Sequence, residues 1–164
     1  MATSAPSSPR WPFAITLVAV IADQLSKNWF VEHYELYESR VVIPGFFRFT
    51  RTFNTGAAFS LFKDHPEILT LISVVVFGLM VVFRTKLFAN TKTEQIAFGL
   101  IAGGIIGNLT DRMQYGHVID FIHWYVGEYS WPIFNIADSC ICVGVGLYMF
   151  SGFQKDPKVS KTSS

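Results

Sequence analysis

Charged residues are scarce in this chain. Asp, Glu, Lys and Arg make up 15% of its 164 residues, whereas about 25% is usual for a soluble globular domain. So little charge excludes an ordinary water-facing surface, and a hydrophobic content of 51% excludes intrinsic disorder. The mean hydropathy of +0.36 agrees with both exclusions. Because the length is that of one domain, we predict a single membrane domain over residues 1–164.

Several familiar functional motifs are also missing. The net charge of +1 leaves no excess of basic residues for nucleic acid. The two cysteines, Cys140 and Cys142, are too few for a disulfide framework or a zinc site, and we interpret them as small apolar residues. There is no His-Glu-x-x-His motif of a zinc protease, and no Gly-x-Ser-x-Gly motif or evident Ser–His pair of a serine hydrolase. We therefore expect no metal ion, no organic cofactor and no nucleic-acid partner.

Four apolar segments are present, each close to the length of about 20 residues that crosses a bilayer. They cover residues 11–31, 67–84, 95–113 and 133–153. The predicted fold class is mainly α and integral to the membrane, with four transmembrane helices. For the first segment the alternative is a cleavable signal peptide, but the apolar segments that follow make an uncleaved helix the simpler interpretation. The tails, residues 1–9 and 155–164, are rich in Ser, Pro and Lys and are predicted to be disordered.

Four transmembrane helices place both termini on one side. On that side, short flanks and the loop at 84–94 carry seven of the 13 basic residues and few acidic ones. Because positive charge gathers on the cytoplasmic side of membrane proteins, we predict that both termini lie in the cytoplasm. The loop at 32–66 then lies on the outer side and is too long for a plain connection. Within it, residues 41–43, a turn at 44–45 and the aromatic run 46–53 predict paired short strands. We expect a small extracytoplasmic β-rich region there.

Two carboxylates stand in apolar surroundings. Asp138 lies about one turn into the fourth apolar segment, and Asp120 has two apolar neighbours on each side. An acid in such a place is energetically costly and usually functional. The two acids are 18 positions apart, and the chain between them leaves the third segment and re-enters the fourth, so we expect the two side chains to meet near the outer edge of the bilayer. Two carboxylates in a low-dielectric site share one proton and supply an acid and a base for peptide hydrolysis; the alternative is that each caps a helix or pairs with a base.

Other polar residues are spaced to join this site. Asn108 and Arg112 are four residues apart, so they share one helix face, and Asn135 and Asp138, three apart, share another. Asn108 and Arg112 belong to the third apolar segment, and the other two residues to the fourth. We interpret Asp111 as a helix-end acid that faces water, outside the site.

The first and third segments each carry a pattern with a structural interpretation. Asp23 and Lys27, an acid four residues before a base, either support the site or form a structural ion pair. Gly99, Gly103 and Gly107 recur every four residues and predict a smooth stripe for close packing of helices.

Five blocks, in order along the chain, carry a resemblance to a known family. They are 23–27 (DQLSK), 53–60 (FNTGAAFS), 103–112 (GGIIGNLTDR), 117–121 (HVIDF) and 134–139 (FNIADS). Each block is weak alone, but together, in a chain with four apolar segments, they closely resemble the bacterial lipoprotein signal peptidase (signal peptidase II) family. Phe53 and Thr110 depart from the family pattern, since Tyr is common at both positions.

The resemblance implies an intramembrane aspartyl endopeptidase of the bacterial inner membrane. The family removes signal peptides from prolipoproteins whose cysteine already carries a diacylglyceryl group, and it cuts just before that cysteine. Asp120 and Asp138 match the catalytic pair. The implied partners are diacylglyceryl-prolipoproteins and membrane lipids, and we expect a monomer with its active site near the periplasmic face.

By the same resemblance, further residues line the substrate pocket or support it. The pocket positions are Asn54, Gly56, Asn108, Arg112 and Asn135, and the supporting pair is Asp23 and Lys27.

Two other functions stay open on the residues alone. Buried acids are also typical of a small proton or ion pathway, although four helices without an inverted repeat make a poor transporter. The other possibility is a non-catalytic membrane scaffold.

Overall fold

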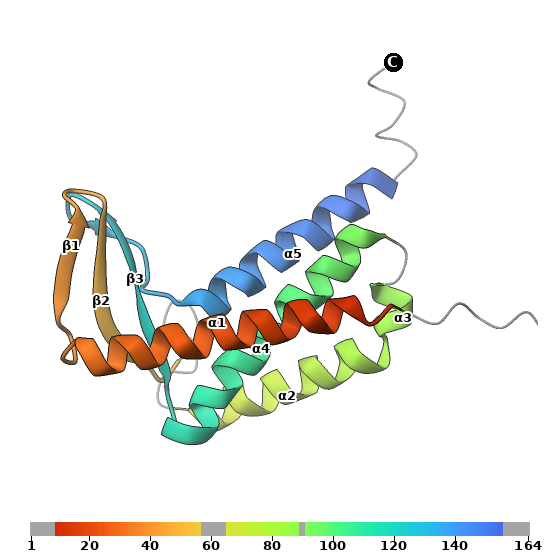
Figure 1. Ribbon diagram of the computed structural model, residues 1–164, viewed down its shortest axis with the longest axis horizontal. Helices are drawn as coiled ribbons and strands as arrows, with labels where there is room; N and C mark the ends of the chain where they lie inside the picture. Colours follow the sequence, from red (N-terminus) through yellow and green to blue (C-terminus); the bar gives the residue numbers. More distant parts are fainter. Residues whose placement is uncertain (1–8, 57–64, 89–90, 156–164) are drawn as a thin grey trace, which may run out of the picture.

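The computed structural model describes residues 9–56, 65–88 and 91–155. The predictions of disordered tails and the family block at 53–60 lie partly outside these residues. The helices are α1 (Trp11–His33), α2 (Pro66–Val82), α3 (Arg84–Leu87), α4 (Lys92–Tyr115) and α5 (Ile136–Lys155). The strands are β1 (Ser39–Ile43), β2 (Phe47–Asn54), β3 (Val118–Val126) and β4 (Tyr129–Ser130). The predicted fold class is confirmed in its coarse form: a mainly helical chain with a small antiparallel sheet (Figure 1).

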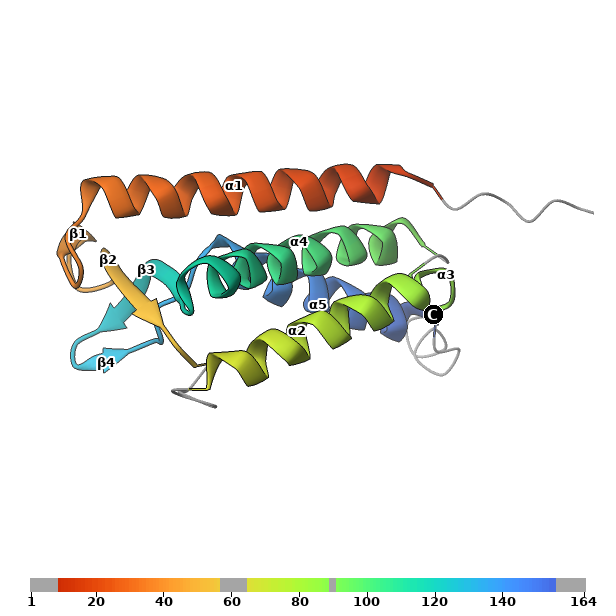
Figure 2. The same cartoon turned by 90° about the horizontal axis from the view of Figure 1, so that it is seen from below.

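The four long helices lie alongside one another, and the sheet stands at one end of them (Figures 1 and 2). Helix α4 is the centre of this arrangement, because it contacts α1, α2 and α5. It begins where the Thr91 hydroxyl accepts a hydrogen bond from the Glu94 N–H at 3.1 Å, and it ends at Gly116, whose φ of 74° is left-handed. Both are common helix-terminating arrangements.

The glycine stripe of α4 packs against α1, as the sequence predicts. A Cβ atom at Gly103 would stand 2.5 Å from the Ala19 Cβ, and one at Gly99 would stand 2.7 Å from the Pro12 carbonyl oxygen. Both distances are far below ordinary carbon contact. The absence of side chains therefore sets how closely the two helices approach.

The sheet has the strand order β1-β2-β3-β4, with every neighbouring pair antiparallel. The predicted pairing of β1 with β2 is confirmed. Strand β3 is a finding that the sequence analysis missed. It pairs with β2, and this register sets Asp120 opposite Thr52.

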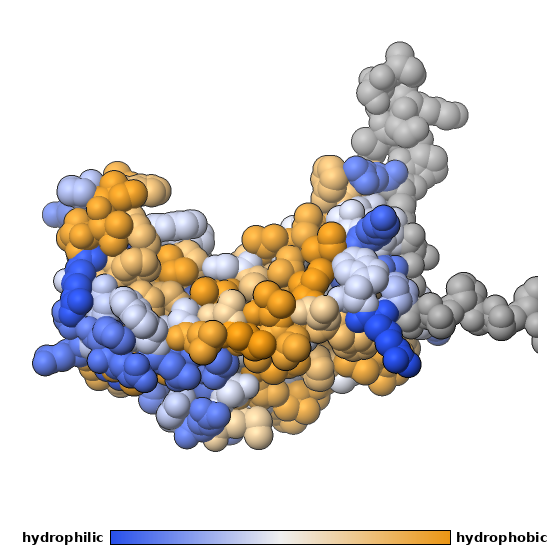
Figure 3. All heavy atoms as spheres, viewed as in Figure 1, coloured by the Kyte–Doolittle hydropathy of each residue, from blue (hydrophilic) through white to orange (hydrophobic). Residues whose placement is uncertain are grey.

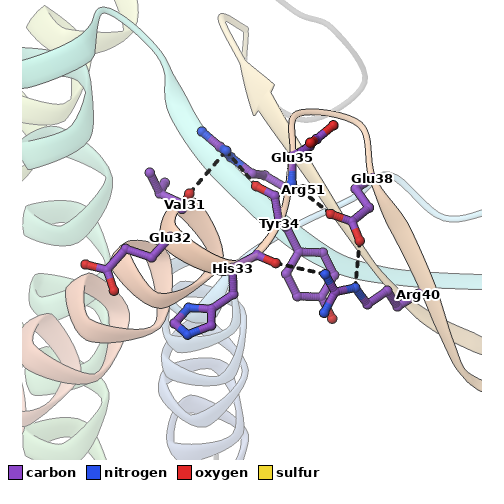
Figure 4. Close-up of a pocket in the computed structure, with 8 residues that line it drawn as sticks. All are labelled: Val31, Glu32, His33, Tyr34, Glu35, Glu38, Arg40 and Arg51. Atoms are coloured by element: carbon purple, nitrogen blue, oxygen red, sulfur yellow. Dashed lines mark hydrogen bonds and ion pairs between the residues drawn. The ribbon is translucent and has the colours of Figure 1, made fainter.

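Two arginines fasten the sheet to the end of α1 (Figure 4). The Arg51 guanidinium donates to the carbonyl oxygens of Tyr34 at 2.7 Å and Val31 at 3.3 Å, and Arg40 donates to the His33 carbonyl oxygen at 2.9 Å. The last carbonyls of a helix have no partner within the helix. Because β1 and β2 supply those partners, they hold the sheet at the C-terminal end of α1.

The helices carry apolar side chains outside and polar ones inside. Large exposed hydrophobic residues on α1 are Trp11, Phe13, Leu17, Val18, Ile21, Leu25, Trp29 and Val31. The buried polar side chains of the helices are Asp23, Lys27, Glu94, Asn108, Asp111 and Ser151. Figure 3 shows a largely hydrophobic surface over the helices, with hydrophilic residues gathered at the two ends. This is the reverse of the usual distribution in a water-soluble protein.

Length and composition alone single out one helix of the described chain, Ile136–Gln154, as able to cross a membrane. The helix Pro66–Val82 is apolar but shorter. The buried polar residues of α1 and α4 lower the hydropathy of those helices. Four transmembrane helices therefore stay a prediction.

Candidate active site

The two acids of the candidate site come from different parts of the fold. Asp120 lies in β3 and Asp138 in the first turn of α5, where the sheet meets the helices. Asp120 is buried, with an exposed fraction of 1%. A charged carboxylate that is buried without a bonded cation is costly in free energy. This position therefore favours the protonated, neutral form of Asp120.

Asn135 connects the two carboxylates. Its side-chain Nδ2 donates to Asp120 Oδ1 at 2.7 Å, and its backbone N–H donates to Asp138 Oδ2 at 3.2 Å. Its Oδ1 accepts from the Asp138 N–H at 2.9 Å, which caps the start of α5. Asn54 in β2 donates from Nδ2 to the second oxygen of Asp120 at 3.2 Å. The predicted residues Asp120, Asp138, Asn135 and Asn54 thus lie together.

The protonation of Asp120 follows from these surroundings. Burial is the main cause, and the nearby charge of Asp138 the second, of a rise in the pKa of Asp120 to about 8. Hydrogen bonds from Asn54 and Asn135 act in the opposite direction with smaller effect. Asp120 consequently keeps its proton at neutral pH.

A buried ionic cluster lies next to the acid pair. Lys27 Nζ is 2.8 Å from Asp23 Oδ2, 2.9 Å from Asp111 Oδ2 and 3.1 Å from Asn108 Oδ1. Asp111 also accepts the Ile119 N–H at 3.0 Å, next to Asp120 in the sequence. The prediction that Asp111 faces water is wrong, because its side chain is 1% exposed and ion-paired.

Two hydrogen bonds join that cluster to the start of α5. Asp23 Oδ1 accepts the Ala137 N–H at 2.9 Å. Asn108 Nδ2 donates to Asp138 Oδ1 at 2.7 Å. The predicted supporting residues Asp23, Lys27 and Asn108 therefore contact the segment that carries Asp138.

Arg112 has an unused donor beside the site. Among the residues that the structure describes, its Nε is buried and has no hydrogen-bond partner. Arg112 lines a groove of about 500 Å³ together with Gly116 of the α4 end and residues of α2. The groove residues of α2 are Pro66, Glu67, Thr70, Leu71 and Val74. Arg112 therefore brings its guanidinium group to the groove between α2 and α4.

Gly56, the remaining predicted pocket residue, donates its N–H to Asn54 Oδ1 at 2.9 Å. This bond orients the Asn54 amide so that its nitrogen faces Asp120. Of the two positions that depart from the family pattern, Phe53 pairs with Ile119 in the sheet and Thr110 lies within α4. The Phe53 ring lies 4.8 Å from the His117 ring, and the Thr110 hydroxyl donates to the Ile106 carbonyl.

The structure contains a Ser–His contact that the sequence analysis did not find. His123 Nε2 lies 2.5 Å from the Ser130 hydroxyl oxygen, across β3 and β4. Arg48 Nε donates to His123 Nδ1 at 3.0 Å, so the neutral ring carries its hydrogen on Nε2 and donates it to Ser130. Burial, and then the charge of Arg48, lower the pKa of His123. The ring therefore presents no base to the serine hydroxyl, and this contact is not a serine nucleophile.

Disulfide and metal sites are also absent among the described residues. Cys140 and Cys142 are free, and no group of three His, Cys, Asp or Glu side chains in residues 9–56, 65–88 and 91–155 is placed to hold a metal ion. The acid pair, its amide partners and Arg112 form the candidate site.

Two solved structures define the class of protein to which this fold and site belong. Both are titled as bacterial membrane enzyme structures. One has a TM-score of 0.83 at 30% identity and covers 90% of each chain; the other has a TM-score of 0.79 at 32% identity and covers 89% of this chain and 94% of the other. The protein is therefore a membrane enzyme.

The family follows from the sequence comparisons. The family described as signal peptidase (SPase) II matches residues 15–154, and the chain belongs to it. Similar proteins include the lipoprotein signal peptidase of Xanthomonas campestris pv. campestris (strain 8004), 39% identical over 153 residues that cover 90% of this chain and 91% of that protein. That of Shewanella loihica is 41% identical over 156 residues, which cover 93% and 91%.

Proposed function

We propose that the protein is an intramembrane aspartyl endopeptidase that removes the signal peptide from diacylglyceryl-modified prolipoproteins, just before the lipidated cysteine. The observation that carries this proposal is the pairing of buried Asp120 with half-buried Asp138 through Asn135. Membership of the signal peptidase II family and the names of the similar proteins support the substrate class. The reaction uses neither a metal ion nor an organic cofactor.

In the proposed reaction the pair acts as acid and base on a bound water. Protonated Asp120 gives its proton to the scissile carbonyl oxygen while ionised Asp138 takes one from the water, whose oxygen bonds to the carbonyl carbon. The resulting diol returns a hydroxyl proton to Asp120 as the C–N bond breaks, and Asp138 passes its proton to the departing cysteine nitrogen. Both acids end in their starting states, ready for another cycle.

Two side chains are suited to hold the substrate peptide. Arg112 Nε is an unused donor at the groove between α2 and α4, and the Asn54 amide lies against Asp120. We assign both to backbone carbonyls of the extended substrate. Apolar residues of the groove, such as Leu71 and Val74, face a substrate that arrives from the bilayer.

We also infer that α1, α2, α4 and α5 all cross the bacterial inner membrane. The hydrophobic surface over the helices supports this inference (Figure 3). The buried polar residues of the helices also support it, because they are shielded from the apolar part of a bilayer. The sheet and the acid pair then lie near the periplasmic face and both termini in the cytoplasm, which agrees with the basic flanks of the helices. Residues 1–164 form one membrane domain, a monomer surrounded by lipid.

The proposal is tested by cleavage of a diacylglyceryl-modified prolipoprotein peptide in detergent. Asp120→Asn and Asp138→Asn, each checked for folding, are compared with the wild type and with Glu32→Gln at an exposed acid. We expect cleavage before the lipidated cysteine, unchanged in the control and slowed by at least about 10²-fold in both Asp variants. A variant that keeps its rate contradicts the assigned pair. A wild type that never cuts a verified substrate, but moves ions in liposomes, contradicts the peptidase.

A further inference from the structure

Strand β2 carries a β-bulge directly before the acid site. Phe49 pairs with Ile122 in β3, and the next recorded pair is Thr52 with Asp120, so β2 advances by three residues where β3 advances by two. A bulge adds one residue to one strand and changes which side chain faces a given partner. In a regular ladder continued from Phe49, the residue opposite Asp120 would be Arg51.

The extra residue keeps Arg51 away from the acids. Its backbone N–H donates to the Glu38 carbonyl oxygen at 3.1 Å, and its carbonyl oxygen accepts the Tyr37 N–H at 2.8 Å. Its guanidinium is bonded to backbone carbonyls at the end of α1 (Figure 4). A guanidinium opposite Asp120 would favour ionisation of both carboxylates and so remove the proton that the pair shares. The bulge instead sets a neutral side chain, Thr52, at this position.

The side chain of Thr52 lies on the same face of the sheet as Asp120. Residues that pair directly across an antiparallel ladder share a face, with Cβ atoms about 5 Å apart. Asn54 supports this placement, because residues two apart in a strand share a face and the Asn54 Nδ2 contacts Asp120 Oδ2 at 3.2 Å. Thr52 and Asn54 therefore both lie next to Asp120.

The Thr52 hydroxyl is available to a ligand. The residue is half-buried, and among the residues that the structure describes its hydroxyl has no hydrogen-bond partner. Thr50 differs, because it is buried and its hydroxyl contacts Ser39 Oγ at 2.7 Å and His123 Nδ1 at 3.1 Å. Thr50 thus joins the strands, whereas Thr52 keeps a donor and an acceptor for another molecule.

The spacing of Thr52 and Asn54 matches that of an extended peptide. Two residues along a strand span about 7 Å, which is also the repeat of the carbonyl groups on one side of an extended chain. A substrate that runs along this part of β2 therefore meets the Asn54 amide and the Thr52 hydroxyl in turn, with Asp120 beside both.

We propose that Thr52 is a further substrate-binding residue: its hydroxyl donates to a backbone carbonyl of the prolipoprotein peptide, two residues along the peptide from the carbonyl that Asn54 binds. This rests on the proposed peptidase function and adds a second contact from β2. The competing explanation is that Thr52 only fills a strand position, which any β-branched side chain would do.

Two substitutions at this position separate the explanations. Thr52→Val keeps the branched shape and removes the hydroxyl, whereas Thr52→Ser keeps the hydroxyl and removes the methyl group. Because no described residue bonds to the hydroxyl, we expect both variants to fold, and thermal unfolding in detergent checks this. Thr85→Val, at an exposed position of α3, is the control for loss of a threonine hydroxyl elsewhere.

The first measurement is the kinetics of cleavage of the lipidated peptide. We expect Thr52→Val to lower kcat/KM by about 3–10-fold, the usual effect of one hydrogen bond, and Thr52→Ser and Thr85→Val to stay within about twofold of the wild type. The loss should lie in KM, because a contact present both before and during the reaction adds uniform binding, and the pH profile should not move. A Val variant with the wild-type rate, a Ser variant as slow as the Val variant, or a displaced pH profile overturns the proposal.

The second measurement does not depend on cleavage. The Kd of a fluorescent diacylglyceryl-modified prolipoprotein peptide is measured for Asp138→Asn with and without Thr52→Val. We expect Thr52→Val to raise Kd by about 3–10-fold, whereas an unchanged Kd overturns the proposal. Failure of the proposed function is recognised separately, as an Asp138→Asn variant that still cleaves the peptide at the wild-type rate.

Discussion

The close approach of α4 to α1 gives a prediction with a built-in control. A Cβ atom at Gly107 would stand 2.5 Å from Asp23 Oδ2 and 3.2 Å from the Ala137 Cβ. Ordinary contact would require Asp23 to move by about 1 Å. Asp23 cannot withdraw freely, because Lys27 and the Ala137 N–H hold its two oxygens at 2.8 and 2.9 Å. Gly146 of α5 has nothing within 4 Å of the same position.

The magnitude follows from two opposing effects. Overpacking in a close-packed interior costs about 1–3 kcal/mol, and replacement of a helical Gly by Ala recovers about 1 kcal/mol. Disturbance of the Asp23–Lys27 pair adds to the loss at Gly107, so Gly107→Ala is expected to be destabilising by about 2 kcal/mol overall. Gly146→Ala keeps only the gain of up to about 1 kcal/mol.

Thermal unfolding in detergent micelles, followed by tryptophan fluorescence, measures the difference. Each kcal/mol shifts Tm by about 2–4 °C in a chain of this size, so Gly107→Ala should unfold about 5–10 °C below Gly146→Ala. Cleavage should also be slower in Gly107→Ala, because Asp23 holds Ala137, the neighbour of Asp138. If both variants rise in Tm together, the approach of Gly107 to Asp23 is not rigid and the reasoning fails.

Three further predictions concern the acid, the aromatic core and cofactors. Because the pKa of Asp120 is raised to about 8, a pH series of kcat/KM should fall as the pH rises through about 8 and Asp120 loses its proton; an activity that is flat to pH 10 contradicts this. The same shift affects stability, because between pH 3.8 and about 8 Asp120 holds a proton in the folded chain and releases it in the unfolded chain. The contribution of this proton to the free energy of unfolding is therefore full below pH 3.8 and is lost progressively as the pH rises to about 8. Phe30 is 5% exposed and stacks on Phe121 at 4.1 Å. Phe30→Ala should therefore lower the free energy of unfolding by about 3 kcal/mol, while Leu25→Ala, at an exposed position, should change it by less than about 1 kcal/mol. Similar losses in the two variants would contradict the burial argument. Dialysis against a chelator should leave cleavage unchanged, and a loss that zinc restores would contradict the proposed acid pair.

The helices and the first hairpin could be predicted because their signals are local. Apolar runs of nearly bilayer length mark α1, α2, α4 and α5, and the 44–45 turn between aromatic and β-branched residues marks the pairing of β1 with β2. Whether each helix crosses the bilayer is less evident from composition. Polar residues lower the hydropathy of α1 and α4 in the same way whether they face inward or outward.

The missed features all depend on partners from distant parts of the chain. Asp111 at a helix end is equally compatible with water and with a lysine on another helix, and only the packing of α4 on α1 decides for Lys27. The 118–122 run is too short to distinguish strand from helix without the partner strand β2. By contrast, the four-residue spacing of Asp23 and Lys27 was sufficient to predict their ion pair.

The path of the chain between the two acids bears on how the site tolerates change in length. Ile122 and Phe134 exchange two backbone hydrogen bonds, of 2.8 and 3.1 Å. These bonds join the two ends of the segment between them, which contains β4. Asp120 lies just before the first end and Asp138 just after the second, so the spacing of the carboxylates is set by this pair of hydrogen bonds and not by the segment's length. Doubling the length of a flexible loop costs only about 0.6 kcal/mol of closure entropy. Insertions and deletions around the exposed Tyr129 are therefore the changes of chain length that should disturb the spacing of the two acids least.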